Sequence, residues 1–401
     1  MNPPTNHTNT TLPPKRPPSP PPCGRWLVAG VALLAVLAGC GAPPQRASAP
    51  ATFYPAAPQA ARLQFLAGYS GEQDLGGGPN KFAAFVVGKE PVRKPINKPY
   101  GVALHDGKIY VCDTGSAAID IIDLRTREFR YFTPGGDGKL VTPVNISVDH
   151  DGTRYVADSA GGQILIYGRD DSFLGAIGER VSGKGRAHSP ASVAPVRAES
   201  TGSEAEMKPT DVLVAGDRLY VADLKNHYVR VYDKAKRQLL FTIPRSPATA
   251  DAQSKLFAPA NLAVDTQGRV YVSDLGAFRV LQYSPDGQFL RQFGRGVGDK
   301  PGEFARPKGV AVDREGRVYV VDAATQVVQI FDPDGRLLLF FGDRQGSTPG
   351  LDLPAKVVID YDHNALFAPQ VAPDFQLEYL VIVTNQFGEH KVSVFGFGHK
   401  K

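Results

Sequence analysis

Short runs of β-branched and aromatic residues alternate with turn residues along most of this chain. The clearest unit contains four such runs, which are Gly309–Asp313, Gly316–Asp322, Val328–Asp332 and Arg336–Gly342. Runs of this composition, separated by turn residues such as Asp334 and Gly335, are typical of antiparallel strands. We therefore expect four strands in each unit.

One short phrase, Tyr-Val-x-Asp, closes the second run of each unit. Its aspartates are Asp113, Asp158, Asp223, Asp274 and Asp322, and a degenerate sixth copy ends at Asn385. Successive copies are 45, 65, 51, 48 and 63 residues apart. The shorter spacings are typical of a propeller blade, and the two longer ones predict inserted loops. The pattern predicts an all-β fold, a six-bladed β-propeller.

The two ends of the repeats predict how the ring closes. The sixth unit has three runs and ends with Lys391–Phe395, whereas Arg62–Gly68 resembles a fourth run with no unit before it. Pairing these segments would complete the last blade and remove an open sheet edge. We expect a propeller over residues 62–401, with a closing strand at 62–71 and the repeats at 98–401.

The motifs of Pro307–Asp332 and of Asn226–Asp233 resemble the NHL repeat, which recurs from about Lys98 to the C-terminus. This resemblance implies a six-bladed propeller and leaves the function open, because one fold carries many functions. The single tryptophan, Trp26, lies outside the repeats, which argues against a WD40 propeller.

The N-terminus predicts export. Trp26–Ala38 is apolar, follows Arg25 and has 13 residues, which suits a signal peptide better than the roughly 20 residues of a membrane span. It leads into Leu37-Ala38-Gly39-Cys40, which resembles the bacterial lipobox. The resemblance implies that residues 1–39 are removed and that Cys40 carries lipid, such as palmitate. A plain secretory signal is the alternative. The Ala- and Pro-rich residues 40–61 predict a tether.

The net charge and the expected location limit the kinds of binding partner. Loss of Lys15, Arg16 and Arg25 with the signal peptide lowers the net charge from +5 to +2, so no general attraction to nucleic acid is expected. Gly41 after the cysteine resembles lipoproteins of the outer membrane. We expect a protein anchored outside the cytoplasm, on the outer membrane of a Gram-negative bacterium. Cys112 is expected to be a small buried filler.

The repeated aspartates suggest two interpretations. A ring of carboxylates resembles a metal site, but a residue that every unit shares is better explained by a structural role. We expect each of these carboxylates to accept hydrogen bonds from backbone N–H groups in the turn that follows it.

Departures from the repeat are better candidates for a site. Two residues after the proline that opens each unit, the NHL pattern favours Gly, as at Gly101 and Gly309. The other four units carry Asn145, Asp211, Asn261 and Lys356. We expect these residues near the mouth of the central channel, where a polar ring could bind a small ligand, water or a peptide tip. The alternative is a channel mouth that is simply hydrated.

The connections between units collect basic residues. Lys98, Arg306 and Lys308 are expected to precede their first strands on one face, where they would favour an acidic partner protein. A solvated rim is the alternative. The insertion Asp362–Gln376 carries Phe367 and Phe375, which are expected to be exposed for docking or to cover the lower channel mouth.

Catalysis is not expected. Propeller enzymes that share an NHL-like ring, such as lactonases and amidating lyases, place Glu, His or several Asp around the channel. One Asp with two Asn is a poor cation cage, so we expect no metal, no cofactor and no catalytic residue. The sequence therefore predicts a lipid-anchored, non-catalytic scaffold that binds a protein or other ligand in the cell envelope. The alternative is a metal-dependent hydrolase or lyase of the lactonase or amidating-lyase type.

Overall fold

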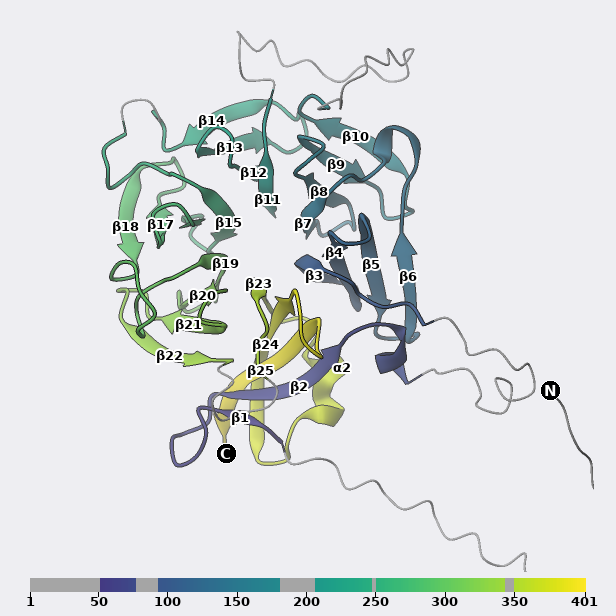
Figure 1. The fold of residues 1–401 in the computed structure, drawn as a ribbon, viewed down its shortest axis with the longest axis vertical. Helices are drawn as coiled ribbons and strands as arrows, with labels where there is room; N and C mark the ends of the chain where they lie inside the picture. The colour runs from purple at the N-terminus through teal and green to yellow at the C-terminus, as the bar shows by residue number, and fades with distance from the viewer. Residues whose placement is uncertain (1–50, 77–92, 181–205, 247–249, 343–349) are drawn as a thin grey trace, which may run out of the picture. The chain divides into compact units, whose positions relative to one another are not determined.

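Six antiparallel sheets surround a common centre in the computed structural model, which describes residues 51–76, 93–180, 206–246, 250–342 and 350–401 (Figure 1). The prediction of an all-β, six-bladed propeller is confirmed. The expected signal peptide, Cys40 and the start of the expected tether lie outside the described residues. Among the residues described, no helix is long and apolar enough to cross a membrane.

Five blades contain four consecutive strands each, and every first strand begins at a proline. Their bounds are β3 (Pro99–His105), β4 (Lys108–Asp113), β5 (Ala118–Asp123), β6 (Glu128–Phe132); β7 (Pro143–Val148), β8 (Arg154–Asp158), β9 (Gln163–Tyr167), β10 (Phe173–Ile177); β11 (Pro209–Ala215), β12 (Arg218–Asp223), β13 (Tyr228–Asp233), β14 (Leu239–Ile243); β15 (Pro259–Val264), β16 (Val270–Asp274), β17 (Arg279–Tyr283), β18 (Phe289–Phe293); and β19 (Pro307–Val312), β20 (Val318–Asp322), β21 (Val327–Phe331), β22 (Leu337–Phe341). We number these blades 1 to 5 in chain order.

Blade 6 combines the two ends of the described chain. Its strands are β23 (Pro354–Asp360), β24 (Phe375–Asn385), β25 (Val392–Lys400), β2 (Leu63–Tyr69) and β1 (Phe53–Tyr54). The N-terminal β2 pairs antiparallel with β25, from Leu63 opposite Phe397 to Tyr69 opposite Val392. This pairing covers the edge that β25 would otherwise expose.

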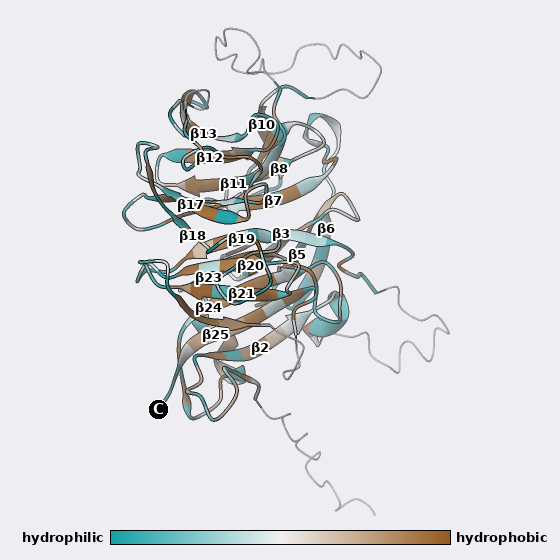
Figure 2. Ribbon diagram, turned by 60° about the vertical axis from the view of Figure 1, so that its left-hand side comes forward, coloured by the Kyte–Doolittle hydropathy of each residue, from teal (hydrophilic) through white to brown (hydrophobic). Residues whose placement is uncertain are grey.

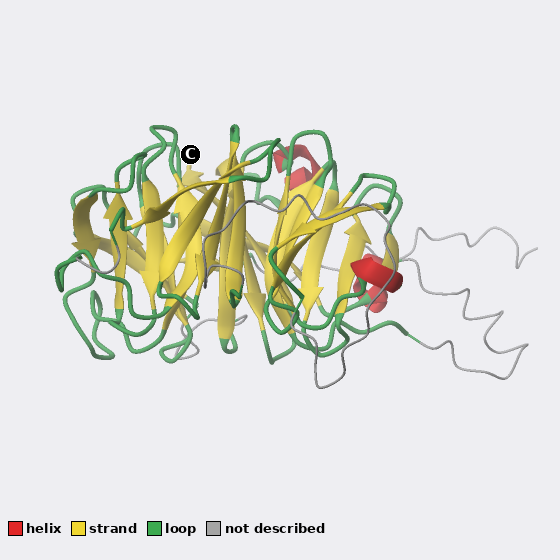
Figure 3. Ribbon diagram, turned by 90° about the horizontal axis from the view of Figure 1, so that it is seen from above, coloured by secondary structure: helices red, strands yellow, loops and turns green. Residues whose placement is uncertain are grey.

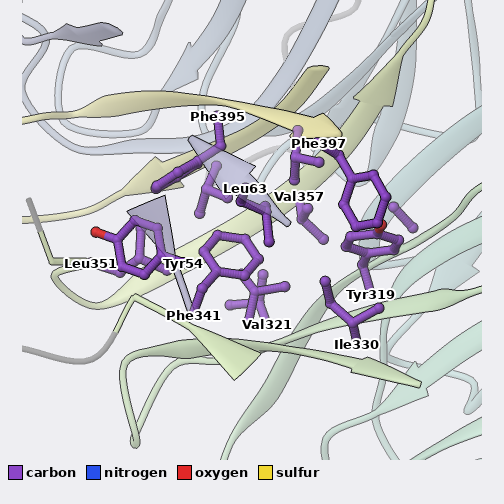
Figure 4. Packing of buried hydrophobic residues seen from close by; sticks show 14 of the residues in the cluster. Tyr54, Leu63, Tyr319, Val321, Ile330, Phe341, Leu351, Val357, Phe395 and Phe397 are labelled. Carbon is purple, nitrogen blue, oxygen red and sulfur yellow. The ribbon is translucent and has the colours of Figure 1, made fainter. Parts of the chain in front are cut away.

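The expected tether over residues 40–61 extends too far, because Phe53–Tyr54 forms β1 within the fold. The Tyr54 ring is buried against Phe341 and Phe395, at centroid distances of 6.1 and 5.8 Å (Figure 4). Leu63 joins the same apolar cluster. Aromatic burial of this kind stabilises an ordered segment despite the alanines and prolines around it.

Apolar side chains pack mainly between neighbouring blades. Figure 2 shows hydrophobic residues gathered on the strands, and Figure 3 shows loops at the two ends of the strands. We call the end that carries the connections between blades the inter-blade face. The prolines that open the first strands lie at this end, so the start of each innermost strand lies there too.

The repeated aspartates hold the turns and the inter-blade connections of this face in place through hydrogen bonds. Asp113 accepts hydrogen bonds from the backbone N–H groups of Asn97 and Lys98, at 2.8 and 2.9 Å, and from Gly115. Asp322 does the same for Arg306, at 2.9 Å. The predicted structural role is confirmed by these bonds, which also reach back to the connection before the blade.

The insertion in blade 6 is folded inward. It contains α2 (Asn364–Phe367) and η3 (Ala368–Gln370), whereas the two other short helices of the described residues, η1 (Glu72–Leu75) and η2 (Gly136–Gly138), lie elsewhere. Phe367 and Phe375 are only 1% and 3% exposed, so the expectation of exposed docking aromatics is wrong. Phe367 instead packs into an apolar cluster with Leu66 and Leu380.

Candidate functional site

Four polar residues meet at the centre of the ring. Asn145, Asp211, Asn261 and Lys356 are each the third residue of an innermost strand, and each is at most 6% exposed. We call these four residues the central layer. The structure brings together the polar ring expected from the sequence, but as a buried set whose members largely bond to one another.

A buried ion pair spans this layer. Lys356 Nζ of blade 6 lies 2.6 Å from Asp211 Oδ2 of blade 3, and these two blades stand opposite each other in the ring (Figure 1). Asp211 also accepts hydrogen bonds from the backbone N–H groups of Val212 and Leu262. Burial raises the pKa of Asp211, while the Lys356 ammonium and these N–H groups oppose that rise.

An amide pair accompanies the ion pair. Asn145 Nδ2 donates one hydrogen bond to Asn261 Oδ1 at 3.0 Å and a longer one to the carbonyl oxygen of Thr210 at 3.4 Å. Asn145 Oδ1 and Asn261 Nδ2 are buried without a partner among the described residues. The ion pair and the amide pair together link blades 2, 3, 4 and 6 across the centre.

Glycine completes the layer in the two remaining blades. A Cβ atom at Gly101 would lie 2.3 Å from Asn145 Oδ1, and one at Gly309 would lie 2.7 Å from the Val357 backbone nitrogen. Both distances are shorter than real contacts allow. Each glycine therefore leaves room for the central-layer region of the following blade.

A second lysine lies one residue earlier along its innermost strand. Lys308 is the second residue of β19 and is only 5% exposed. Its Nζ atom lies 4.5 Å from the centre of the Tyr100 ring of blade 1, a cation–π distance. The blade between them, blade 6, carries the small Ala355 at the equivalent position.

The Lys308 amine has no hydrogen-bond acceptor and no acidic partner within the described ranges. Burial, and then the charges of Arg306 and Lys98, lower its pKa from 10.5 to about 8. Burial likewise raises the pKa of Tyr100 to about 12, so its hydroxyl stays protonated at neutral pH. We call Lys98, Arg306 and Lys308 the cationic cluster.

Sequence reasoning placed all three members of the cationic cluster before their strands, and this is wrong for Lys308. The side chains of Lys98 and Arg306 are exposed, whereas Lys308 lies within β19 and is buried. Tyr100 was missed. The signal was available, because Tyr100 and Lys308 both follow the proline that opens a first strand.

The central layer does not fit a metal ion. Its single carboxylate, Asp211, is already bonded to the Lys356 ammonium, which occupies the place that a cation would need. Over the described part of the chain, no group of three or more His, Cys, Asp or Glu side chains could hold a metal.

A hollow of about 400 Å³ lies elsewhere, beside α2, and is lined mainly by apolar residues that include Val371, Phe375 and Leu377. It is shallow, and none of its lining residues belongs to the central layer or the cationic cluster. We therefore take the centre of the inter-blade face, where charge and burial coincide, as the candidate site.

Comparison with known proteins agrees with this fold. Residues 304–331 match the family model described as the NHL repeat. A protein of unknown function from Bacteroides thetaiotaomicron has a TM-score of 0.53 at 14% identity, covering 84% of this chain and 75% of that one. Virginiamycin B lyase from Staphylococcus aureus gives 0.48 at 10% identity, covering 74% and 80%. A gluconolactonase from Xanthomonas campestris gives 0.48 at 14% identity, covering 87% and 98%.

These comparisons correct one expectation. The sequence predicts a non-catalytic scaffold, with a metal-dependent hydrolase or lyase as the alternative, yet two of the similar solved structures are of named enzymes, a lyase and a gluconolactonase. These two named enzymes contradict the prediction that the protein is not an enzyme. At these identities the likeness itself shows the fold alone.

Proposed function

We propose that the propeller binds a small acidic molecule at the centre of its inter-blade face, with Lys308 as the principal contact. The observation that carries this proposal is Lys308, a residue that is only 5% exposed and whose amine has no acceptor among the described residues, while the Nζ atom itself keeps contact with solvent. An unpaired buried ammonium is costly, and a carboxylate ligand would offset that cost.

The surroundings suit an anion. Lys98 and Arg306 are close enough to lower the pKa of Lys308, so all three positive charges act on the same region. Below them the central layer is occupied by its own ion pair and amide pair. A ligand would therefore rest above this layer, which favours a small molecule over a peptide that threads the ring.

We also propose that the protein works in the cell envelope, held to a membrane by lipid on Cys40. The support is the apolar segment Trp26–Ala38 followed by Leu37-Ala38-Gly39-Cys40. More than one acyl chain gives stable attachment. Metabolic labelling with a fatty acid tests it: label should enter the wild type and be absent from Cys40→Ser, and label in the variant would refute the anchor.

A lyase or hydrolase that acts at the same place is the second candidate. The observation that favours it is the pKa of Lys308, about 8, which leaves part of the amine neutral and basic near neutral pH. A strongly shifted pKa at a polar centre is typical of functional sites. Because the central layer does not fit a metal, this chemistry would use the amine itself.

Titration with simple carboxylates tests the binding proposal. Acetate and succinate should bind the wild type, neutral acetamide should not, and Lys308→Met should bind at least tenfold more weakly. Lys236→Met is the matched control, because Lys236 is an exposed lysine of blade 3 and should leave binding unchanged. Carboxylate binding that is equal in Lys308→Met and the wild type would refute the proposal.

A further inference from the structure

The Lys308 amine combines three features that favour covalent chemistry with a carbonyl group. The Lys308 side chain is largely buried, its amine has no acceptor in the described part of the chain, and the pKa of the amine is about 8. A neutral amine is the nucleophile in imine formation, and desolvation or a neighbouring cation is what activates a lysine for it. Lys308 has both.

Other buried basic groups of the described chain lack this combination. Lys356 is held by Asp211 at 2.6 Å, and Arg230 is held by Asp223 at 2.9 Å. The half-buried Lys234 is likewise paired, with Asp149 at 2.7 Å. An amine that already bonds to a carboxylate keeps its proton and is a poor nucleophile, so these residues serve as internal comparisons for Lys308.

We infer that Lys308 forms a reversible imine with a small molecule that carries both a carbonyl group and a carboxylate, such as a 2-oxo acid. This inference rests on the proposed function and names its ligand class. The carboxylate would lie toward Lys98 and Arg306, which would bring the adjacent carbonyl carbon to the Lys308 amine. A carboxylate without a carbonyl would bind but form no adduct.

The step balances without any further reactant. The nitrogen lone pair attacks the carbonyl carbon, the C=O π electrons move to oxygen, and a proton passes from nitrogen to that oxygen. Loss of the resulting hydroxyl with one more proton, as water, leaves a C=N bond. Nothing is oxidised or reduced, and hydrolysis reverses the reaction.

Reductive trapping tests the inference. The wild type is treated with pyruvate and cyanoborohydride, digested, and mapped by mass spectrometry. We expect one reduced pyruvyl adduct, on Lys308, at a rate that rises with pH around a midpoint near 8. The paired Lys356 and Lys234 should stay unmodified. Adducts spread over exposed lysines, with none enriched on Lys308, would overturn the inference.

Two variants separate this inference from the proposed function. Lys308→Arg keeps the positive charge and should still bind acetate, but it should give no adduct. Lys308→Met should lose both properties. If the wild type binds acetate and pyruvate and no adduct forms on Lys308, the imine is refuted and the binding site stands. If neither acid binds, the proposed function fails as well.

Discussion

Two lysines at the start of neighbouring innermost strands have opposite surroundings. Lys308 of β19 and Lys356 of β23 are similarly buried, at 5% and 6% exposure. The Lys356 side chain reaches across the centre and forms an ion pair with Asp211. Lys308 meets an aromatic ring, Tyr100, and two further cations.

The difference separates a structural charge from one that is available to a ligand. Removing one partner of a buried ion pair costs much stability, because the other charge is then left buried without a counter-charge. An unpaired buried charge already destabilises the fold, so its removal should stabilise the protein and abolish only what it binds. The same substitution should therefore destabilise the fold at Lys356 and stabilise it at Lys308.

The largest effect is expected from Lys356→Met. It leaves Asp211 buried without its partner, and loss of one member of such a pair costs about 3–5 kcal/mol. Urea unfolding should show this loss in the free energy of unfolding. The double variant Asp211→Asn/Lys356→Met should recover most of it, because both charges are gone. A single variant as stable as the wild type would mean that the pair contributes little.

A buried acid extends the comparison. Asp120 of blade 1 is fully buried beside Asp113, the acceptor to which its carboxyl proton can be donated, whereas its equivalent in blade 3, Arg230, bonds to Asp223. Burial, and then the charge of Asp113, raises the pKa of Asp120 from 3.8 to about 9. At neutral pH the Asp120 carboxyl group is therefore protonated.

Asp120→Asn should flatten the dependence of stability on pH. The folded pKa lies above the unfolded one, so the stability that this group contributes is fully present below pH 3.8 and is lost as the pH rises toward 9. At pH 9 the variant should be more stable than the wild type by about 3 kcal/mol, since each pKa unit corresponds to about 1.4 kcal/mol and the shift is only partly realised. Thermal unfolding from pH 5 to 9 measures this, and parallel curves for the two proteins would contradict it.

Lys308→Met should stabilise the fold at neutral pH by about 2 kcal/mol, since about 1.4 kcal/mol per pKa unit of unfavourable burial is removed and some cation–π attraction is lost. The pKa of Lys308 is lower in the folded state than in the unfolded state. The stability advantage of the variant over the wild type should therefore shrink as the pH rises from 8 to 10.5. Melting temperatures at pH 7 and 10 provide the measurement. A variant that is less stable than the wild type at pH 7 would place Lys308 among the structural charges.

Arg306→Gln should have the smallest effect. Its side chain is exposed, so stability should change by less than about 0.5 kcal/mol. Carboxylate binding should weaken about threefold at low salt, and the difference should shrink at high salt because exposed charges are screened. Calorimetric titration at two ionic strengths tests this, with Arg291→Gln as an exposed control on β18. An effect that is independent of salt would argue against an electrostatic role.

The fold could be predicted because it is repeated. Six copies of one strand pattern, closed by the Tyr-Val-x-Asp phrase, gave the blades and the hydrogen-bonding role of the aspartates. The site could be predicted only in part, because it depends on which side chains meet across the centre. The sequence places Lys356 and Asp211 far apart, and only the ring geometry shows that they pair while Lys308 does not.

Two errors share this cause. Phe367 and Phe375 looked exposed because they lie in an insertion, but the insertion folds back onto blade 6 and buries both. Phe53–Tyr54 looked like tether because of its composition, but Tyr54 finds an apolar cluster between two blades. Local composition does not reveal such long-range contacts.

The pKa of the Lys308 amine in solution is the most direct test of the central claim. NMR detection of lysine side-chain resonances, assigned with Lys308→Arg, would give the titration midpoint with and without acetate. We predict a midpoint near 8 in the free protein, and a higher one with acetate, because a bound anion favours the ammonium form. A midpoint near the ordinary 10.5 that does not respond to acetate would contradict the account.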